Sequence, residues 1–203
     1  MIKNSYPGKF IVFEGLDGSG QTTQAELLRD FLQGQGKEVL LTKEPTKESE
    51  AGKKIRDILD QKETIFPKEF QELFAQDRKE HLEHSIIPAL QQGIWVVSDR
   101  YFFTSFAYGM AEGVDLEYFV QINNEFLLPD LSFFLKANPE VCIKRIQERK
   151  TPFTYFEKKD HFERAAKAFE SLAKRFENVY VIDSEQSIGK VAKDIQTVLA
   201  EKL

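Results

Sequence analysis

Several features are scarce in this chain of 203 residues, and each scarcity excludes a class of protein. Cys142 is the only cysteine, so an internal disulfide is excluded and a reducing compartment is favoured. No apolar run approaches the ~20 residues of a membrane helix, and residues 1–9 lack the apolar region of a signal peptide. The net charge of −5 gives no general attraction to nucleic acid or to a membrane. We therefore expect one globular domain over residues 1–203, located in the cytoplasm, without nucleic-acid or membrane partners.

Residues 10–24, FIVFEGLDGSGQTTQ, are the most informative part of the sequence. The phosphate-binding pattern G-x-x-x-x-G-K-[ST] extends from Gly15 to Thr22, but Gln21 stands at the position of the lysine. An apolar strand before the loop, glycines that let backbone N–H groups surround an anion, and a helix N-terminus after it all suit a phosphate. A glycine-rich turn without a ligand is the alternative. The expected phosphate-binding residues are Gly15, Gly18, Ser19, Gly20, Gln21, Thr22 and Thr23.

Apolar strand-like runs alternate with helical patterns along the chain, which predicts a parallel sheet covered by helices. Strands are expected at residues 10–14, 38–42, 95–98, 131–135 and 179–182. Helices are expected at 22–33, 52–59, 67–92, 116–126, 140–149, 156–176 and 188–202. The segment 150–160 contains a proline, aromatic residues and lysines between two helices, so we expect a mobile loop there.

Asp99 and Arg100 follow the apolar run 95–97, which places them at the C-terminal end of a strand beside the phosphate loop. A carboxylate there can hold Mg²⁺ directly or through water, together with the hydroxyl of Thr22. An arginine there can clamp a phosphoryl group during transfer. A simple salt bridge at the strand end is the alternative, but the neighbouring phosphate loop favours the functional interpretation.

Further motifs follow the loop in order, and together they resemble the thymidylate kinase family. They are TKEPT at 42–46, ELFAQDR at 72–78, PAL at 88–90, SDRY at 98–101, SFAY at 105–108, LPDL at 128–131 and residues 139–149. The resemblance extends over nearly the whole chain. It implies a three-layer α/β fold of the P-loop NTPase type, with a five-stranded parallel sheet and a short lid at about residues 145–160. It also implies a homodimer and Mg²⁺-dependent phosphoryl transfer from ATP to thymidine monophosphate (dTMP).

The same resemblance assigns residues to the acceptor nucleotide. Phe74 matches the phenylalanine that stacks on the acceptor base, and Arg78, on the same helix face, matches an arginine that contacts the acceptor. Asp17 matches the acidic loop residue that faces the acceptor sugar and phosphate. Arg100 matches the arginine between the donor and acceptor phosphates. The other implied acceptor residues are Glu44, Pro45, Tyr101, Ser105 and Tyr108.

Catalysis is expected to come from positioning and charge, without a covalent intermediate. Arg145 and Arg149 are four residues apart on a helix that leads into the lid, so both can converge on phosphates. Family members with an acidic loop residue, here Asp17, usually supply such arginines from the lid. The expected catalytic residues are therefore Asp17, Arg100, Arg145 and Arg149. For Arg145, a solvated basic helix face is an equal alternative.

The chain departs from the family at three positions, which leaves alternatives open. Gln21 replaces the loop lysine, Lys43 replaces the arginine before Glu-Pro, and Gly109 stands where many members have a glutamine near the thymine. The first departure suggests a nucleotide-binding protein with weakened catalysis. The last suggests another pyrimidine monophosphate as acceptor.

Two other features of the sequence are tempting but are expected to be structural. His81 and His84 have a spacing that could suit a metal, but no third ligand is nearby, so we expect an exposed helical face. Cys142 lies on an apolar helical stripe and is expected in the core.

Overall fold

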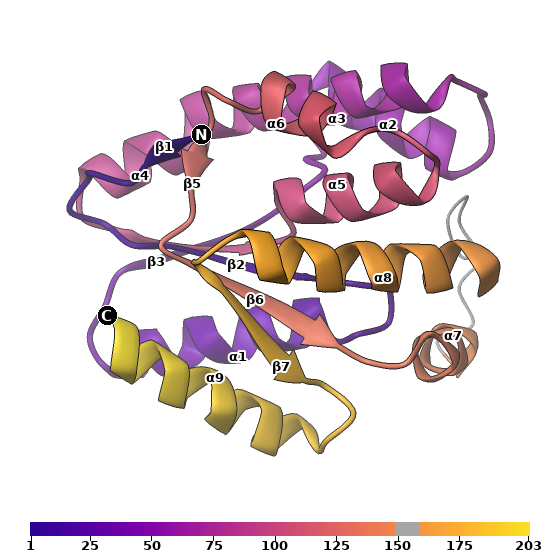
Figure 1. Cartoon of the computed structure of the whole chain (residues 1–203). Helices are drawn as coiled ribbons and strands as arrows, with labels where there is room; N and C mark the ends of the chain where they lie inside the picture. The colour runs from indigo at the N-terminus through magenta and orange to yellow at the C-terminus, as the bar shows by residue number, and fades with distance from the viewer. Residues whose placement is uncertain (149–158) are drawn as a thin grey trace.

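A computed structural model describes residues 1–148 and 159–203, and its centre is the predicted parallel sheet (Figure 1). The strands are β2 (Phe10–Gly15), β3 (Val39–Lys43), β4 (Trp95–Asp99), β6 (Leu131–Lys136) and β7 (Val179–Asp183). Their order is β3-β4-β2-β6-β7, and all neighbours are parallel. The α/β class and the five-stranded parallel sheet are confirmed. A second, two-stranded sheet pairs β1 (Ile2–Lys3) with β5 (Leu127–Leu128), which was not predicted.

Strand β2 lies at the centre of the sheet and positions the phosphate loop. Every residue from Phe10 to Gly15 is buried because helices cover both faces of the sheet. Phe13 of β2 pairs with Asp99 of β4, and Lys43 of β3 pairs with the same Asp99. Since the strands are parallel, their C-terminal ends meet at one edge, where the loop after β2 also begins.

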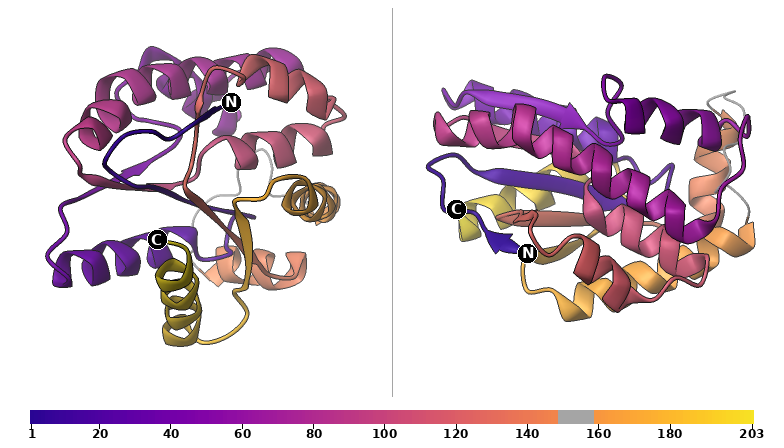
Figure 2. Two further views of the ribbon diagram at one scale, coloured as in Figure 1. Left: turned by 60° about the vertical axis from the view of Figure 1, so that its left-hand side comes forward. Right: turned by 90° about the horizontal axis from the view of Figure 1, so that it is seen from above.

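Helices cover the two faces of the sheet and complete a three-layer arrangement (Figures 1 and 2). On one face, α1 and α9 enclose a core that includes Leu28, Ile195 and Phe133. The other face carries the larger, aromatic-rich core beneath α5 and α8. The described helices are α1 (Gln21–Gly34), α2 (Glu50–Leu59), α3 (Pro67–His81), α4 (Ile87–Gln91), α5 (Phe102–Ala111), α6 (Leu116–Ile122), α7 (Pro139–Glu148), α8 (Lys159–Arg175) and α9 (Ile188–Lys202).

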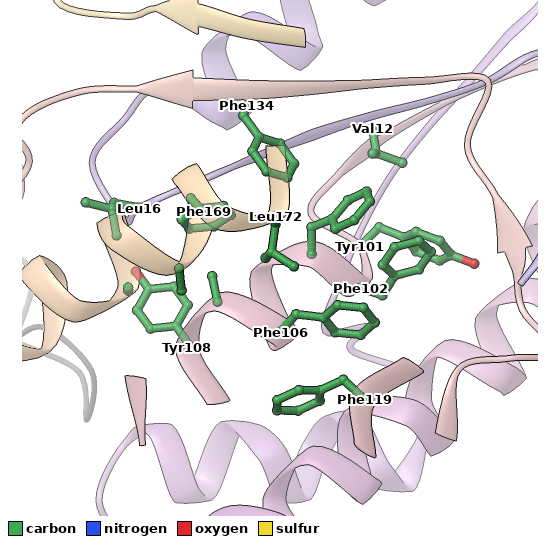
Figure 3. Close-up of a cluster of buried hydrophobic side chains, with 14 of the residues drawn as sticks. Val12, Leu16, Tyr101, Phe102, Phe106, Tyr108, Phe119, Phe134, Phe169 and Leu172 are labelled. Carbon is green, nitrogen blue, oxygen red and sulfur yellow. The ribbon is translucent and has the colours of Figure 1, made fainter. Parts of the chain in front are cut away.

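Helix α5 was not predicted from the sequence, and its environment explains the omission. Nearly all of its residues are buried, so it has no polar face and no amphipathic period. Figure 3 shows its aromatic side chains within the larger core. The ring of Phe106 stacks on Phe102 and on Phe119, with centroid distances of 5.1 and 5.2 Å. Cys142 is buried in the same cluster, as predicted.

The predicted helix 67–92 is interrupted. A π-helical turn, η1 (Leu82–Ile86), separates α3 from α4, and Pro88 lies in the first turn of α4. Proline lacks an N–H and cannot complete the α-helical hydrogen-bond ladder, which accounts for the local change of period. The predicted helix 116–126 ends early, at Ile122. Residues 149–158, which hold Arg149 and most of the predicted lid, lie outside the described residues. No helix within the described ranges has the length and apolar character to cross a membrane.

Candidate active site

Two clefts meet at the phosphate loop. The first has a volume of about 760 Å³ and is lined by loop residues, by residues 42–49 at the end of β3 and beyond it, by Asp99 at the end of β4, and by Arg100. The second has a volume of about 490 Å³ and lies between the loop, α7 and the segment after β7. Gly18, Gly20 and Thr23 line both clefts. The two clefts therefore share part of the loop, and a further cleft of about 540 Å³ lies against its first residues, Gly15 and Leu16.

The loop has the conformation that its glycines predicted. Gly18 and Gly20 have φ values of 84° and 101°, which side chains of other residues rarely adopt. A Cβ atom on Gly18 would also lie 2.5 Å from the carbonyl oxygen of Cys142. Thr22 and Thr23 are exposed in the first turn of α1, whereas Ser19 is buried. The exposed helix N-terminus is suited to an anion in either cleft.

Gln21 is used inside the loop. Its Nε2 donates to the carbonyl oxygen of Gly15 at 2.8 Å, and its Oε1 accepts a hydrogen bond from Nη2 of Arg100 at 3.2 Å. The side chain is only 4% exposed. Its amide therefore joins the loop to Arg100, and no formal charge stands where the pattern has lysine.

Arg100 and Asp17 form an ion pair at the floor of the first cleft. Nη2 of Arg100 lies 2.8 Å from Oδ1 of Asp17, and the hydroxyl of Tyr108 donates to the other carboxylate oxygen at 2.6 Å. Burial opposes the charge of Arg100, but neighbouring groups, Asp17 first, raise its pKa above the ordinary value. Arg100 also has a φ of 76°, a strained conformation for a side-chain-bearing residue that is held by its N–H bond to Phe13.

Glu14 is a buried acid that interacts electrostatically with Arg100, and it was not predicted from the sequence. Its carboxylate accepts hydrogen bonds from the backbone N–H groups of Phe103 and Thr104 at 3.1 and 2.9 Å, and thus caps α5. Burial raises the pKa of Glu14 to about 7, against the opposing effects of Thr104 and Arg100. A glutamate inside the apolar run of β2 was the available signal.

Thr22 and Asp99, the residues predicted to hold a metal, are in contact with each other. The Thr22 hydroxyl donates to Oδ2 of Asp99, while the buried Oδ1 has no hydrogen-bond partner among the described residues. A carboxylate and a hydroxyl are hard oxygen donors, which fits Mg²⁺ bound together with nucleotide phosphates and water. The described ranges contain no group of three or more His, Cys, Asp or Glu arranged for a metal. Lys43 also contacts this pair, with Nζ 2.6 Å from Oδ2 of Asp99.

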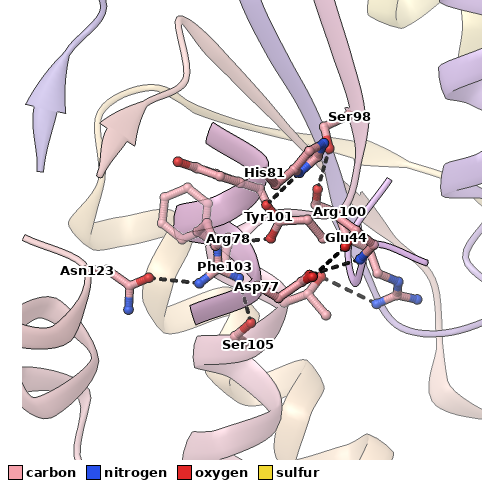
Figure 4. Close-up of polar contacts among 12 residues, drawn as sticks. Glu44, Asp77, Arg78, His81, Ser98, Arg100, Tyr101, Phe103, Ser105 and Asn123 are labelled. Carbon is pink, nitrogen blue, oxygen red and sulfur yellow. Dashed lines mark hydrogen bonds and ion pairs between the residues drawn. The ribbon is translucent and has the colours of Figure 1, made fainter. Parts of the chain in front are cut away.

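Arg78 is the centre of a buried polar network (Figure 4). Its Nε lies 2.9 Å from Oε2 of Glu44, Nη1 donates to Asn123 at 2.8 Å, and Nη2 donates to Ser105 at 2.9 Å. The guanidinium carbon lies 5.2 Å from the centroid of the Tyr101 ring. The structure thus brings together Glu44, Arg78, Tyr101 and Ser105, four residues predicted for the acceptor.

Arg145 connects the loop to the segment after β7. Its Nη1 donates to the carbonyl oxygen of Gly18 at 3.4 Å, and Nη2 donates to that of Ser184 at 2.9 Å. Arg145 also lines the second cleft. These contacts disfavour the alternative of a solvated basic face.

Comparison with known proteins agrees with this geometry. The family model for thymidylate kinase matches residues 13–195. A probable thymidylate kinase of Pyrococcus horikoshii is 40% identical, with 97% of this chain and 98% of that protein covered. A thymidylate kinase of Brachyspira hyodysenteriae is 36% identical, with 96% and 94% covered. The chain belongs to the thymidylate kinase family. The prediction of a nucleoside monophosphate kinase of the P-loop type is thereby confirmed at the level of the family.

Some residues that the family resemblance assigned to the acceptor do not line the clefts. Among the described residues, neither cleft is lined by Phe74, Arg78, Tyr101, Ser105 or Tyr108. The hydroxyl of Tyr101 donates to the carbonyl oxygen of Leu127 at 3.0 Å, so this side chain lies in the core. Phe74 is half-buried, with its ring 4.9 Å from Phe70. Glu44 and Pro45 do line the first cleft. The acceptor roles of all these residues stay predictions.

Two residues of α3 hold the segment after β3 in place, and both were missed. Asp77 accepts hydrogen bonds from the backbone N–H of Thr46 at 2.9 Å and from the hydroxyl groups of Thr46 and Ser49. His81 lies 3.1 Å from Glu44 through Nδ1 and 2.7 Å from Thr42 through Nε2. The prediction that His81 is exposed is therefore wrong: it lies on the same face of α3 as Arg78 and is 5% exposed.

Gly109 has a packing role. A Cβ atom there would lie 2.2 Å from Cζ of Phe119 and 3.0 Å from Cδ of Gln71. The close approach of α5 to α6 and α3 thus requires glycine at this position. The packing of these helices therefore explains the glycine at position 109 without any effect on the choice of acceptor.

Proposed function

We propose that the protein transfers the γ-phosphoryl group of ATP to dTMP, giving ADP and thymidine diphosphate. The observation that carries this proposal is the meeting of two clefts at the phosphate loop, with Arg100 and Asp17 on one side. A protein that only binds one nucleotide needs one such cavity. Two cavities that share loop residues suit the transfer of a group between two bound molecules.

The chain supplies positioning and charge. The loop amides and the N-terminus of α1 bind the donor phosphates. Thr22 and Asp99 hold Mg²⁺, which neutralises phosphate charge when it is bound. Arg100, oriented by Asp17 and Gln21, stabilises the charge that spreads over the phosphoryl group during transfer. Arg145 and Arg149 are proposed to assist from the donor side.

We further propose that Phe74 stacks on the acceptor base and that Arg78, Tyr101, Ser105 and Tyr108 complete its site. These side chains lie on α3, on α5 and at the start of α5, and Arg78 contacts Glu44, which lines the first cleft. Their proposed roles require α3 or α5 to move when the acceptor binds. The resemblance also supports a single domain with a lid at about residues 145–160, a homodimer and a cytoplasmic location. Analytical ultracentrifugation of the purified protein tests the homodimer.

The reaction is tested by measuring ADP formation from ATP with a panel of nucleoside monophosphates, with and without Mg²⁺. Preferred turnover of dTMP that requires Mg²⁺ supports the proposal. Faster turnover of uridine or cytidine monophosphate would assign another acceptor. Nucleotide binding without turnover of any acceptor would instead support a binding protein with weakened catalysis, the alternative that the neutral Gln21 favours.

A further inference from the structure

Lys43 is an additional cation at the phosphate loop. It is the last residue of β3, and its Nζ lies 2.6 Å from Oδ2 of Asp99 and 3.3 Å from the Thr22 hydroxyl. The parallel pairing of β3 with β4 sets this position, because Lys43 is in register with Asp99. The side chain is 54% exposed, so its ammonium group can move within the cleft.

Three other described cations near the loop already have partners, and Lys47, which also lines the cleft, contacts neither Thr22 nor Asp99. Arg100 is paired with Asp17 at 2.8 Å. Arg56 donates to the carbonyl oxygen of Thr46 at 2.7 Å. Arg145 donates to two backbone carbonyls, and Gln21 is neutral and directed into the loop. Lys43 is itself paired with Asp99, but its side chain is half exposed, and it is the one of these described cations that contacts Thr22.

We propose that Lys43 gives the outer phosphates of ATP the positive charge that the phosphate loop lacks at position 21. This inference rests on the proposed function for the identity of the donor. In phosphate loops the Thr22 position faces the metal and the outer phosphates, where the loop lysine also reaches. The ammonium group of Lys43 is already within 3.3 Å of that hydroxyl.

Lysine suits this role at position 43. Its ammonium is a compact point charge with three donors on a flexible stem, and it can rotate from a carboxylate to a phosphate oxygen. The phosphates of ATP would draw the ammonium group from Asp99 with or without a metal, and Asp99 and Thr22 would then be available to hold Mg²⁺ when it is bound. The two departures from the family motifs, at positions 21 and 43, then compensate each other: one removes a lysine from the loop and the other provides one from β3.

The test measures nucleotide binding by calorimetry in the presence of EDTA, without acceptor, so that neither turnover nor Mg²⁺ contributes. We expect Lys43→Met to weaken ATP binding by about tenfold or more, because a charged hydrogen bond to phosphate is lost. AMP has no outer phosphates, so its affinity should stay within about twofold. Lys47→Met is the matched control: this exposed lysine lines the same cleft, and its ammonium contacts neither Thr22 nor Asp99.

A rescue experiment makes the inference specific. In the Lys43→Met background, Gln21→Lys should restore most of the ATP affinity, because it returns the charge to the loop. Lys43→Gln, which stays polar, should show the same selective loss and guards against a fold defect in the methionine variant.

Unchanged ATP binding in Lys43→Met would overturn the inference, and so would an equal loss of ATP and AMP. Loss of dTMP binding alone would assign Lys43 to the acceptor instead. If wild-type protein does not phosphorylate dTMP but its ATP binding depends on Lys43, the proposed function fails and this inference stands.

Discussion

The buried Glu14 predicts how stability changes with pH. Its pKa is raised from 4.5 to about 7 because burial disfavours the charged form. In the unfolded chain the carboxyl ionises near its ordinary value. The folded state therefore gains stability from the protonated form below pH 4.5 and loses this contribution as the pH rises to about 7. The pKa difference corresponds to about 3 kcal/mol of unfolding free energy.

Glu14→Gln isolates this contribution. The N–H groups of Phe103 and Thr104 donate to different oxygens of the carboxylate, so the one amide oxygen of the variant can accept only one of them. The cap of α5 is therefore kept in part and without a titrating group, and the lost hydrogen bond lowers stability equally at every pH. We expect the unfolding free energy of the wild type to fall, relative to the variant, by about 3 kcal/mol between pH 4.5 and pH 8. Other ionisable groups contribute to both profiles and cancel in the difference.

Urea denaturation followed by the fluorescence of Trp95 measures this difference. Trp95 is the only tryptophan and lies in β4, so it reports on the central sheet. The protein concentration should stay in the micromolar range, because the net charge is close to zero near pH 5.4 and an uncharged protein aggregates more readily. Glu26→Gln, at an exposed position of α1, is the control and should give a profile parallel to the wild type. Parallel profiles for wild type and Glu14→Gln would refute the reasoning.

Three further variants test packing, the buried network and the metal pair. Gly109→Ala should destabilise the protein by about 1–3 kcal/mol, because its Cβ would overlap the Phe119 ring; thermal unfolding measures this, and an unchanged midpoint would contradict it. Arg78→Met should cost about 3–5 kcal/mol in urea denaturation, because it leaves the Glu44 carboxylate buried without its ion partner; a loss below about 1 kcal/mol would show that the network is not stabilising. Asp99→Asn should raise the Mg²⁺ concentration for half-maximal turnover by about tenfold or more, and an unchanged Mg²⁺ dependence would remove Asp99 from the metal site.

The strands were predictable because each contains a short run of apolar residues that is visible in the sequence. Each strand of the main sheet was placed to within one residue at either end. Burial of the inner strands β2, β4 and β6 produces nearly uninterrupted apolar runs, and the partly exposed edge strands β3 and β7 keep short apolar runs that mark them as well. The same kind of burial concealed α5, because a helix that is apolar on all sides lacks the period that marks helices. Pro88 was visible in the sequence and marks where the helix changes period, but a proline alone does not specify a π-helical turn.

The site was predictable where topology alone brings residues together. Thr22, Asp99 and Arg100 follow parallel strands or the loop, so their proximity follows from strand order. Glu14 and Asp77 could not be found in this way. Glu14 contacts a backbone N–H 90 residues away in sequence, and Asp77 contacts one 31 residues away. Such contacts depend on the way helices pack on the sheet, which local pattern does not determine.

The contacts of Gln21 give this neutral residue of the phosphate loop a structural role. Gln21 joins Gly15 to Arg100, and Arg100 in turn is held by Asp17. A lysine at position 21 would place a second cation beside Arg100, whereas glutamine supplies the acceptor that orients it. The missing charge is then best supplied from another element, and β3 places Lys43 in contact with Thr22. Gln21 in the loop thus orients Arg100, and Lys43 on β3 supplies the positive charge for the phosphates. These two roles lie on two different elements of this chain.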